Sequence, residues 1–291
     1  MQSTLLAALA LVFNALVWGV SWWPFRELQE RGLHPLWATA IIFVLSLLCL
    51  LLVRPGAWRS LLQYPLLWLL MFASGLTNVG FNWAVTVGDV VRVVLLFYLM
   101  PAWVVLLAWP LLGERPNQGS LMRLALALLG VAIVLKTPES PWPVPAGLAD
   151  WLALMGGFGF ALTNILLRRL KHTPSESRVL AMFGGGALLA IAAAVSGMSV
   201  GQVAAPPAPG MIWMGLAVLI SLAFLAGNLA LQYGASRLRA NTTSLILLTE
   251  VVFASVSSVA LGAGELASRT LIGGALILLA ALLSASAPQG D

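Results

Sequence analysis

Long apolar segments separated by short polar joints run through almost the whole chain. A helix needs about 20 mainly apolar residues to cross a bilayer, and lipid favours helices because their backbone polar groups are satisfied internally. Clusters of charged residues, proline and glycine mark the joints. The pattern predicts an all-α integral membrane protein with ten spanning helices, at residues 3–23, 34–53, 65–87, 90–112, 118–136, 147–168, 178–198, 210–234, 238–261 and 268–287.

Polar residues recur at matching places in the two halves of the chain. The third segment carries Asn78, Asn82 and Trp83. The eighth carries Asn228, Gln232 and Tyr233 at the corresponding positions, 150 residues later. In the same order, Trp18 and Trp22 of the first segment correspond to Phe160 and Asn164 of the sixth. These matches indicate an internal repeat.

A proline-rich joint divides the repeat into five spans and five spans. We expect a first repeat at residues 1–139, a linker at 140–146 and a second repeat at 147–288. Five is an odd number, so two halves of the same fold must enter the membrane in opposite directions. Such inverted repeats are typical of secondary transporters.

The composition and the charges agree with this topology. Hydrophobic residues make up 60% of the 291 residues and charged residues 9%, against about a quarter charged in a soluble domain. With the N-terminus in the cytoplasm, ten Lys and Arg fall in cytoplasmic joints and five in outer ones. The positive-inside rule therefore supports a topology with the N-terminus in the cytoplasm, and an even number of spans places the C-terminus on the same side.

Several classes of function find no support in the sequence. The basic residues are scattered in pairs at segment ends, without the basic run that nucleic-acid binding needs. No metalloprotease motif, nucleophile elbow or carboxylate pair within a span occurs, so we expect no catalytic residues and no enzyme activity. His34 and His172 lie far apart and Cys49 is the sole cysteine, so we expect no metal site and no cofactor.

Polar stripes on two predicted helices are candidates for a binding site. Ser74, Asn78 and Asn82 share one helical face, and so do Ser221, Asn228 and Gln232. One interpretation is hydrogen bonding between helices, and the other is a path lined by both halves. The occurrence of the stripe in both halves favours the path.

Glu250 is the one acidic residue deep within a predicted span. It could bind a proton or a substrate amine, or it could bond to a neighbouring helix. Aromatic residues near the middle of spans suit an apolar solute. Pro24, Pro101 and Pro110 should end or kink helices, either as hinges for gating or as static bends.

These features resemble the EamA type of the drug/metabolite transporter superfamily. The resemblance rests on two five-helix halves, Trp18-Gly19, Pro101 followed by Gly113-Glu114, and Glu250 followed by Gly264-Glu265. It departs in Val251, where the family often has proline after the glutamate. Within the family, the chain is most similar to YddG-type bacterial exporters of aromatic and other hydrophobic amino acids.

The resemblance implies a ten-helix basket with a central cavity walled by spans 1, 3, 4, 6, 8 and 9. We therefore expect a monomer in the lipid of a bacterial inner membrane, with both termini in the cytoplasm. It should export aromatic or other hydrophobic amino acids, or similar small metabolites, by alternating access. Another metabolite or drug, or a scaffold role without transport, is the alternative. The expected substrate-binding residues are Trp18, Trp22, Asn78, Asn82, Trp83, Tyr98, Asn164, Asn228, Gln232, Tyr233 and Glu250.

Overall fold

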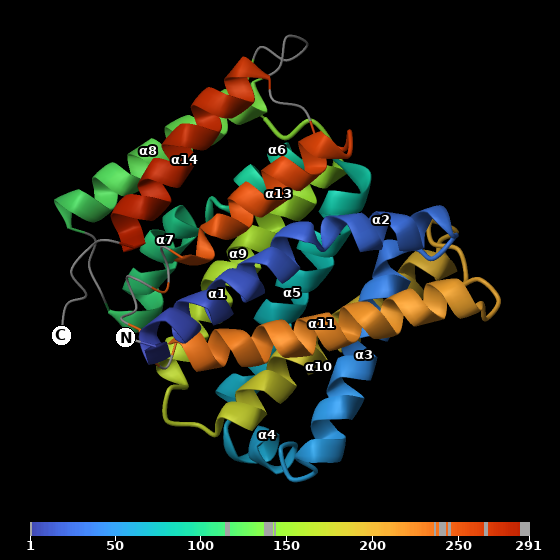
Figure 1. The fold of residues 1–291 in the computed structure, drawn as a ribbon. Helices are drawn as coiled ribbons and strands as arrows, with labels where there is room; N and C mark the ends of the chain where they lie inside the picture. The colour runs from blue at the N-terminus through green and yellow to red at the C-terminus, as the bar shows by residue number, and fades with distance from the viewer. Residues whose placement is uncertain are drawn as a thin grey trace.

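The computed structural model describes residues 2–113, 117–136, 142, 144–235, 237–238, 243, 246–264 and 267–285. Within these ranges every regular element is a helix (Figure 1). The helices are α1 (Gln2–Val20), α2 (Trp22–Glu30), α3 (Pro35–Val53), α4 (Arg59–Gln63), α5 (Leu66–Val87), α6 (Val90–Phe97), α7 (Met100–Leu112), α8 (Gln118–Leu135), α9 (Leu148–Arg169), α10 (Ser175–Ser199), α11 (Met211–Ala235), α13 (Thr249–Ala260) and α14 (Ser268–Ala285).

The expected fold of ten spans is confirmed. Among the described residues, seven helical stretches are long and apolar enough to cross a membrane. The 22-residue α5, which carries two asparagines, and the shorter apolar helices α13 and α14 bring the total to ten. Most predicted limits lie within one helical turn of the observed ends. The expected start of span 9, at residues 239–242, lies outside the described residues.

Two predicted spans of the first half are broken rather than continuous. Span 1 was expected to end at residue 23, but the helix resumes after a turn at Ser21 and continues as α2 to Glu30. Pro24 lies in the first turn of α2, where a missing N–H costs least, so the break at Ser21 accommodates it. Span 4 is split at Tyr98 and Leu99 into α6 and α7.

The packing of the helices shows the internal repeat. If α1, α3, α5, α6–α7 and α8 are exchanged with α9, α10, α11, α13 and α14, the main contacts map onto one another. The contact of α5 with α9 becomes that of α11 with α1, and α5 with α10 becomes α11 with α3. The pairs α3–α10, α6–α13 and α8–α14 map onto themselves. This exchange is the signature of two repeats related by a pseudo-two-fold axis.

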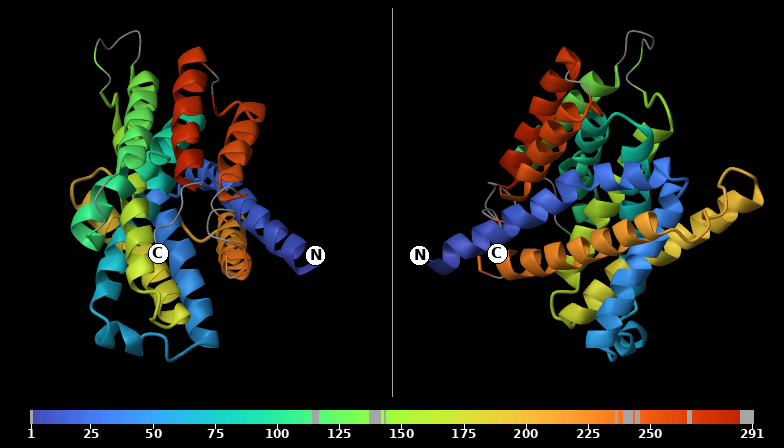
Figure 2. Two further views of the ribbon diagram at one scale, coloured as in Figure 1. Left: turned by 90° about the vertical axis from the view of Figure 1, so that its left-hand side faces the viewer. Right: turned by 45° about the vertical axis from the view of Figure 1, so that its right-hand side comes forward.

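Helices α8 and α14 stand together at one edge of the molecule (Figures 1 and 2). They meet at Gly130 and Gly273, where a Cβ added to either glycine would come within 2.6 Å of the other's carbonyl oxygen. Spans 5 and 10 therefore lie at the periphery of the bundle. The remaining helices form the body of the bundle, with α1 and α11 side by side across it.

Glycines allow the central helices to approach one another closely. A Cβ on Gly185 of α10 would lie 1.9 Å from the carbonyl oxygen of Met71 in α5. A Cβ on Gly80 of α5 would lie 2.6 Å from the carbonyl oxygen of Leu152 in α9. The backbones of α5, α9 and α10 touch at these points, which is the role that small residues have in membrane helix packing.

Candidate functional site

Spans 4 and 9 are interrupted near their middles. In span 4 the break precedes Pro101, which has no N–H to offer the carbonyl of Phe97. That carbonyl faces α9, where a Cβ on Gly157 would come within 2.5 Å of the oxygen. In span 9 the turn residue Leu248 precedes α13, so this helix begins at mid-span although Val251 stands where proline was expected. Discontinuous helices of this kind form the binding sites of many transporters.

The two breaks are joined by a hydrogen bond. The Tyr98 hydroxyl, at the end of α6, donates to Oε2 of Glu250 in the first turn of α13 over 3.1 Å. Negative charge is favourable in the first turn of a helix, which gives Glu250 a partial electrostatic partner. A carboxylate near the centre of a bilayer still costs at least about 2.5–3.5 kcal/mol on insertion scales. No Lys or Arg among the described residues forms an ion pair with it.

Span 1 closes over this junction. A Cβ on Gly19 would come within 2.7 Å of the backbone carbonyl oxygen of Glu250, so α1 and α13 are in backbone contact. Just beyond the break at Ser21, the Trp22 indole N–H donates to Oγ of Ser257 over 2.9 Å. Trp18 points elsewhere and stacks on Phe224 of α11, with ring centroids 4.3 Å apart. The structure thus brings Trp22, Tyr98 and Glu250 onto the contact between spans 1, 4 and 9.

The expected site residues of α5 are enclosed between helices. Asn82 is fully buried and donates from Nδ2 to Oγ1 of Thr39 in α3 over 3.2 Å. Asn78 donates to the carbonyl of Ser74 over 2.8 Å, and the Ser74 hydroxyl donates to the Met182 carbonyl of α10. These contacts fit the first interpretation of the stripe, hydrogen bonding between helices. The carbonyl of the Asn82 side chain has no partner in the described part of the structure.

Their counterparts in the second half are accessible. Gln232 of α11 is exposed and donates from Nε2 to Oδ1 of the half-buried Asn228 over 2.7 Å. Asn164 of α9 is also exposed and donates to the Phe160 carbonyl over 2.8 Å. The matched amides of the two repeats therefore lie in different environments.

The remaining expected residues lie away from the junction. Trp83 meets the His34 ring edge-on at a centroid distance of 5.3 Å. The guanidinium carbon of Arg237 lies 3.7 Å from the centroid of the Tyr233 ring, over its face. Pro110 lies inside α7, two residues before its end at Leu112. The segments around Glu114 and Glu265 lie outside the described residues.

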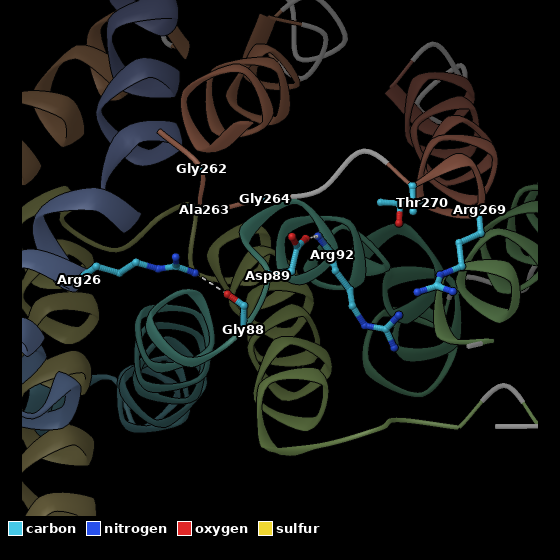
Figure 3. A pocket seen from close by; sticks show the side chains of 10 residues that line it. Arg26, Gly88, Asp89, Arg92, Gly262, Ala263, Gly264, Arg269 and Thr270 are labelled. Carbon is cyan, nitrogen blue, oxygen red and sulfur yellow. Dashed lines mark hydrogen bonds between the residues drawn. The ribbon is translucent and has the colours of Figure 1, made fainter. Parts of the chain in front are cut away.

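A polar network seals the end of the bundle where α5 ends and α6 begins. Arg92 makes two hydrogen bonds of 2.8 Å to the carboxylate of Asp150 in α9 and a third to the Val134 carbonyl of α8. Arg26 of α2 donates to the carbonyls of Val85 and Gly88 where α5 ends. Arg26 and Arg92 thus fasten α2 and α6 to their neighbours. A third arginine, Arg269 of α14, lies close by (Figure 3).

A surface pocket of about 320 Å³ lies beside this network. Its lining comes from the start of α6, the joint before α14 and the arginines Arg26, Arg92 and Arg269 (Figure 3). In the sequence, Arg26 and Arg92 stand out only as charges in joints, and no partner was expected for Asp150. The signal for the pair is its position, because Arg92 and Asp150 lie at the starts of predicted spans 4 and 6, which both begin on the same side of the membrane.

Asn14 was also missed. It lies in the middle of α1, is buried, and donates from Nδ2 to the Gly227 carbonyl of α11 over 2.9 Å. A lone asparagine within an otherwise apolar span predicts such a contact between helices. Asn14 thus joins α1 to α11, which correspond to α9 and α5 of the other repeat.

Comparison with known proteins agrees with the fold and the repeat. Over 128 residues the chain is 30% identical to a Pseudomonas aeruginosa protein described as an uncharacterized transporter, an alignment covering 43% of this chain and 40% of that relative. The fold is similar to that of a protein of known crystal structure, with a TM-score of 0.56 over 95% of both chains at 18% identity. The model of the EamA-like transporter family matches residues 5–136 and again residues 147–286, one match for each repeat, and the chain belongs to this family.

Proposed function

We propose that this protein exports aromatic and other hydrophobic amino acids, or closely similar metabolites, across a bacterial inner membrane. Family membership makes it a small-molecule transporter embedded in lipid. The observation that carries the finer proposal is the junction of broken helices at Tyr98 and Glu250. There, an aromatic ring and a carboxylate offer an apolar surface and one charged acceptor to a solute with an aromatic body and an ammonium group.

The amides supply the other half of the site. Asn164, Asn228 and Gln232 carry both donors and acceptors and are accessible, so they can bind the polar end of an amino acid. The described residues of the spans contain no free basic cluster at this depth, which disfavours a polyanionic substrate. Trp22 and Phe160 would enclose the apolar body.

Alternating access follows from the repeat. Two repeats of the same fold in different environments can exchange their environments, which opens the site first to one side and then to the other. The sealed end with Arg26 and the Arg92–Asp150 pair is then the outer side, and the accessible amides face the cytoplasm. The excess of basic residues in the joints assigned to the cytoplasm supports this orientation.

Counterflow in proteoliposomes tests the proposal. Purified protein in vesicles loaded with unlabelled tryptophan should take up labelled tryptophan and phenylalanine well above protein-free vesicles, and labelled aspartate at the background rate. The double variant N228A/Q232A should lose most of this flux while retaining its elution profile in detergent. Flux of no amino acid in the panel would contradict the substrate class.

A further inference from the structure

Glu250 differs from every other acidic group that the structure describes. Glu27 lies at the exposed end of α2 in a surface pair with Arg31, and Asp150 is held by Arg92. Glu250 lies at mid-span, and its hydrogen-bond partner among the described residues is the neutral hydroxyl of Tyr98. A charge at mid-membrane depth is normally paired, so this carboxyl requires either a proton or a cation that the described residues do not supply.

Within the part of the chain that the structure describes, no charged group on the helices packed against α13 is available to supply that cation. Helix α1 carries no titratable side chain between Gln2 and Val20. On α6, Tyr98 makes the contact and Arg92 lies six residues earlier, about 9 Å along the axis, where Asp150 binds it. On α2, Arg26 is engaged by two backbone carbonyls of the α5 end.

We propose that the Tyr98–Glu250 junction is an exchange site, where a proton and the ammonium group of the substrate compete for the carboxylate of Glu250. This inference rests on the proposed transport function and adds its driving force. One carboxylate can hold one proton or one ammonium group, but not both. Export is therefore coupled to proton entry.

The charges balance over one cycle. Open to the cytoplasm, the protonated carboxyl releases its proton to water and accepts the ammonium group in its place. Open to the outside, a proton binds the carboxylate and the ammonium group leaves. The neutral, protonated site then returns. One proton enters for each zwitterionic amino acid that leaves, so each cycle moves one positive charge inward.

The proposed exchange depends on the ammonium group of the substrate. Tryptamine, which keeps the indole and the ammonium group but lacks the carboxylate, should bind. Indole-3-propionate, which keeps the indole and the carboxylate but lacks the ammonium group, should bind at least tenfold more weakly. Equal binding of the two compounds would overturn the role of the ammonium group.

Proton release measures the competition directly. Addition of saturating tryptamine to the purified full-length protein in weakly buffered detergent solution should release about one proton per tryptamine bound at acid pH. Over the same range, the apparent affinity should fall by up to about tenfold for each unit of acidification, because a single proton competes. Binding without proton release, with an affinity independent of pH, would overturn the exchange. Both measurements use the unmodified protein.

The variants locate the exchange at one carboxyl group. Glu250→Gln keeps the shape and a hydrogen-bonding side chain but cannot take up or release a proton. It should abolish proton release, whereas Glu27→Gln, the same replacement in an exposed pair, should retain it. Release that persists in Glu250→Gln would assign the proton elsewhere and overturn the inference. Transport that continues in wild-type protein without any proton release would leave the proposed function intact while removing the coupling, and the two failures are therefore distinguishable.

Discussion

At the scale of single residues, the glycines of the central helices set the tightest geometric limits. Gly185 and Gly184 are neighbours on α10 with different surroundings. A Cβ on Gly185 would fall 1.9 Å from a backbone oxygen of α5, whereas one on Gly184 would meet only the flexible end of Met71 at 3.2 Å. The sequence shows a run of three glycines here, but not which of them makes the contact, because that depends on the rotation of α10.

Gly185→Ala should therefore lower stability, and Gly184→Ala should not. The first replacement forces the backbones of α5 and α10 apart and should cost about 1–3 kcal/mol or more. The second should be near neutral, since the better helix propensity of alanine, about 1 kcal/mol, offsets a small adjustment of Met71. Thermal unfolding of the two variants in the same detergent gives the comparison. Equal melting temperatures would show that α5 and α10 do not touch at Gly185.

The polar residues show a second limit of the sequence at this scale. The amide stripes were recognisable from their spacing and their recurrence in both halves. Their environments were not, because Asn82 bonds to Thr39 on a helix that is distant in sequence, while Gln232 bonds to a neighbour on its own helix. Spacing along a helix determines which face a residue occupies. Only the packing of the other helices decides what covers that face.

At the scale of elements, the spans could be read from hydropathy but the break in span 9 could not. Pro24 and Pro101 indicate the breaks in spans 1 and 4. Span 9 turns at Leu248 without any proline in the sequence nearby. A turn without proline is held by tertiary contacts, here the Tyr98–Glu250 bond and the close approach of Gly19 to α13.

The ion pair of Arg92 and Asp150 fastens α6 to α9 at the sealed end. Both side chains are largely buried, and Asp150 also accepts from the Ala146 N–H. Asp150→Asn leaves the Arg92 charge without its partner and should destabilise the protein by about 3 kcal/mol or more. Glu27→Gln breaks the exposed pair with Arg31 and should cost less than about 1 kcal/mol.

Salt provides an independent check on the ion pair. Thermal unfolding at low and at high ionic strength should show the full loss in Asp150→Asn at both, because a buried pair is only weakly screened. A loss that disappears in high salt would place the pair on the surface and remove its role as a fastening.

At the scale of the whole molecule, the two repeats share a contact plan but differ in closure. The α5 face, with Asn78 and Asn82, is enclosed by α3, α9 and α10, whereas the α11 face, with Asn228 and Gln232, is open. The sequence indicated the inverted repeat through its odd number of spans per half. It carried no information on which half is closed, because both arrangements use the same residues and differ only in the relative positions of the helices.

If the repeats exchange environments during transport, the two faces must exchange accessibility. In the described part of the structure, the side-chain carbonyl of Asn82 is buried without a hydrogen-bond partner. Opening of the α5 face would let water or substrate donate a hydrogen bond to it. In a background with Cys49 replaced by serine, Gln232→Cys should react with a water-soluble maleimide at least tenfold faster than Asn82→Cys in the resting protein. Saturating tryptophan on both sides of the vesicle, which drives repeated cycling, should raise the rate at Asn82→Cys and lower it at Gln232→Cys. Ala190→Cys, buried within the α3–α10 contact that maps onto itself, should stay unreactive throughout. Continued transport with no change at Asn82→Cys would mean that the protein moves its substrate without exchanging its two halves, because an exchange cannot leave the closed face closed.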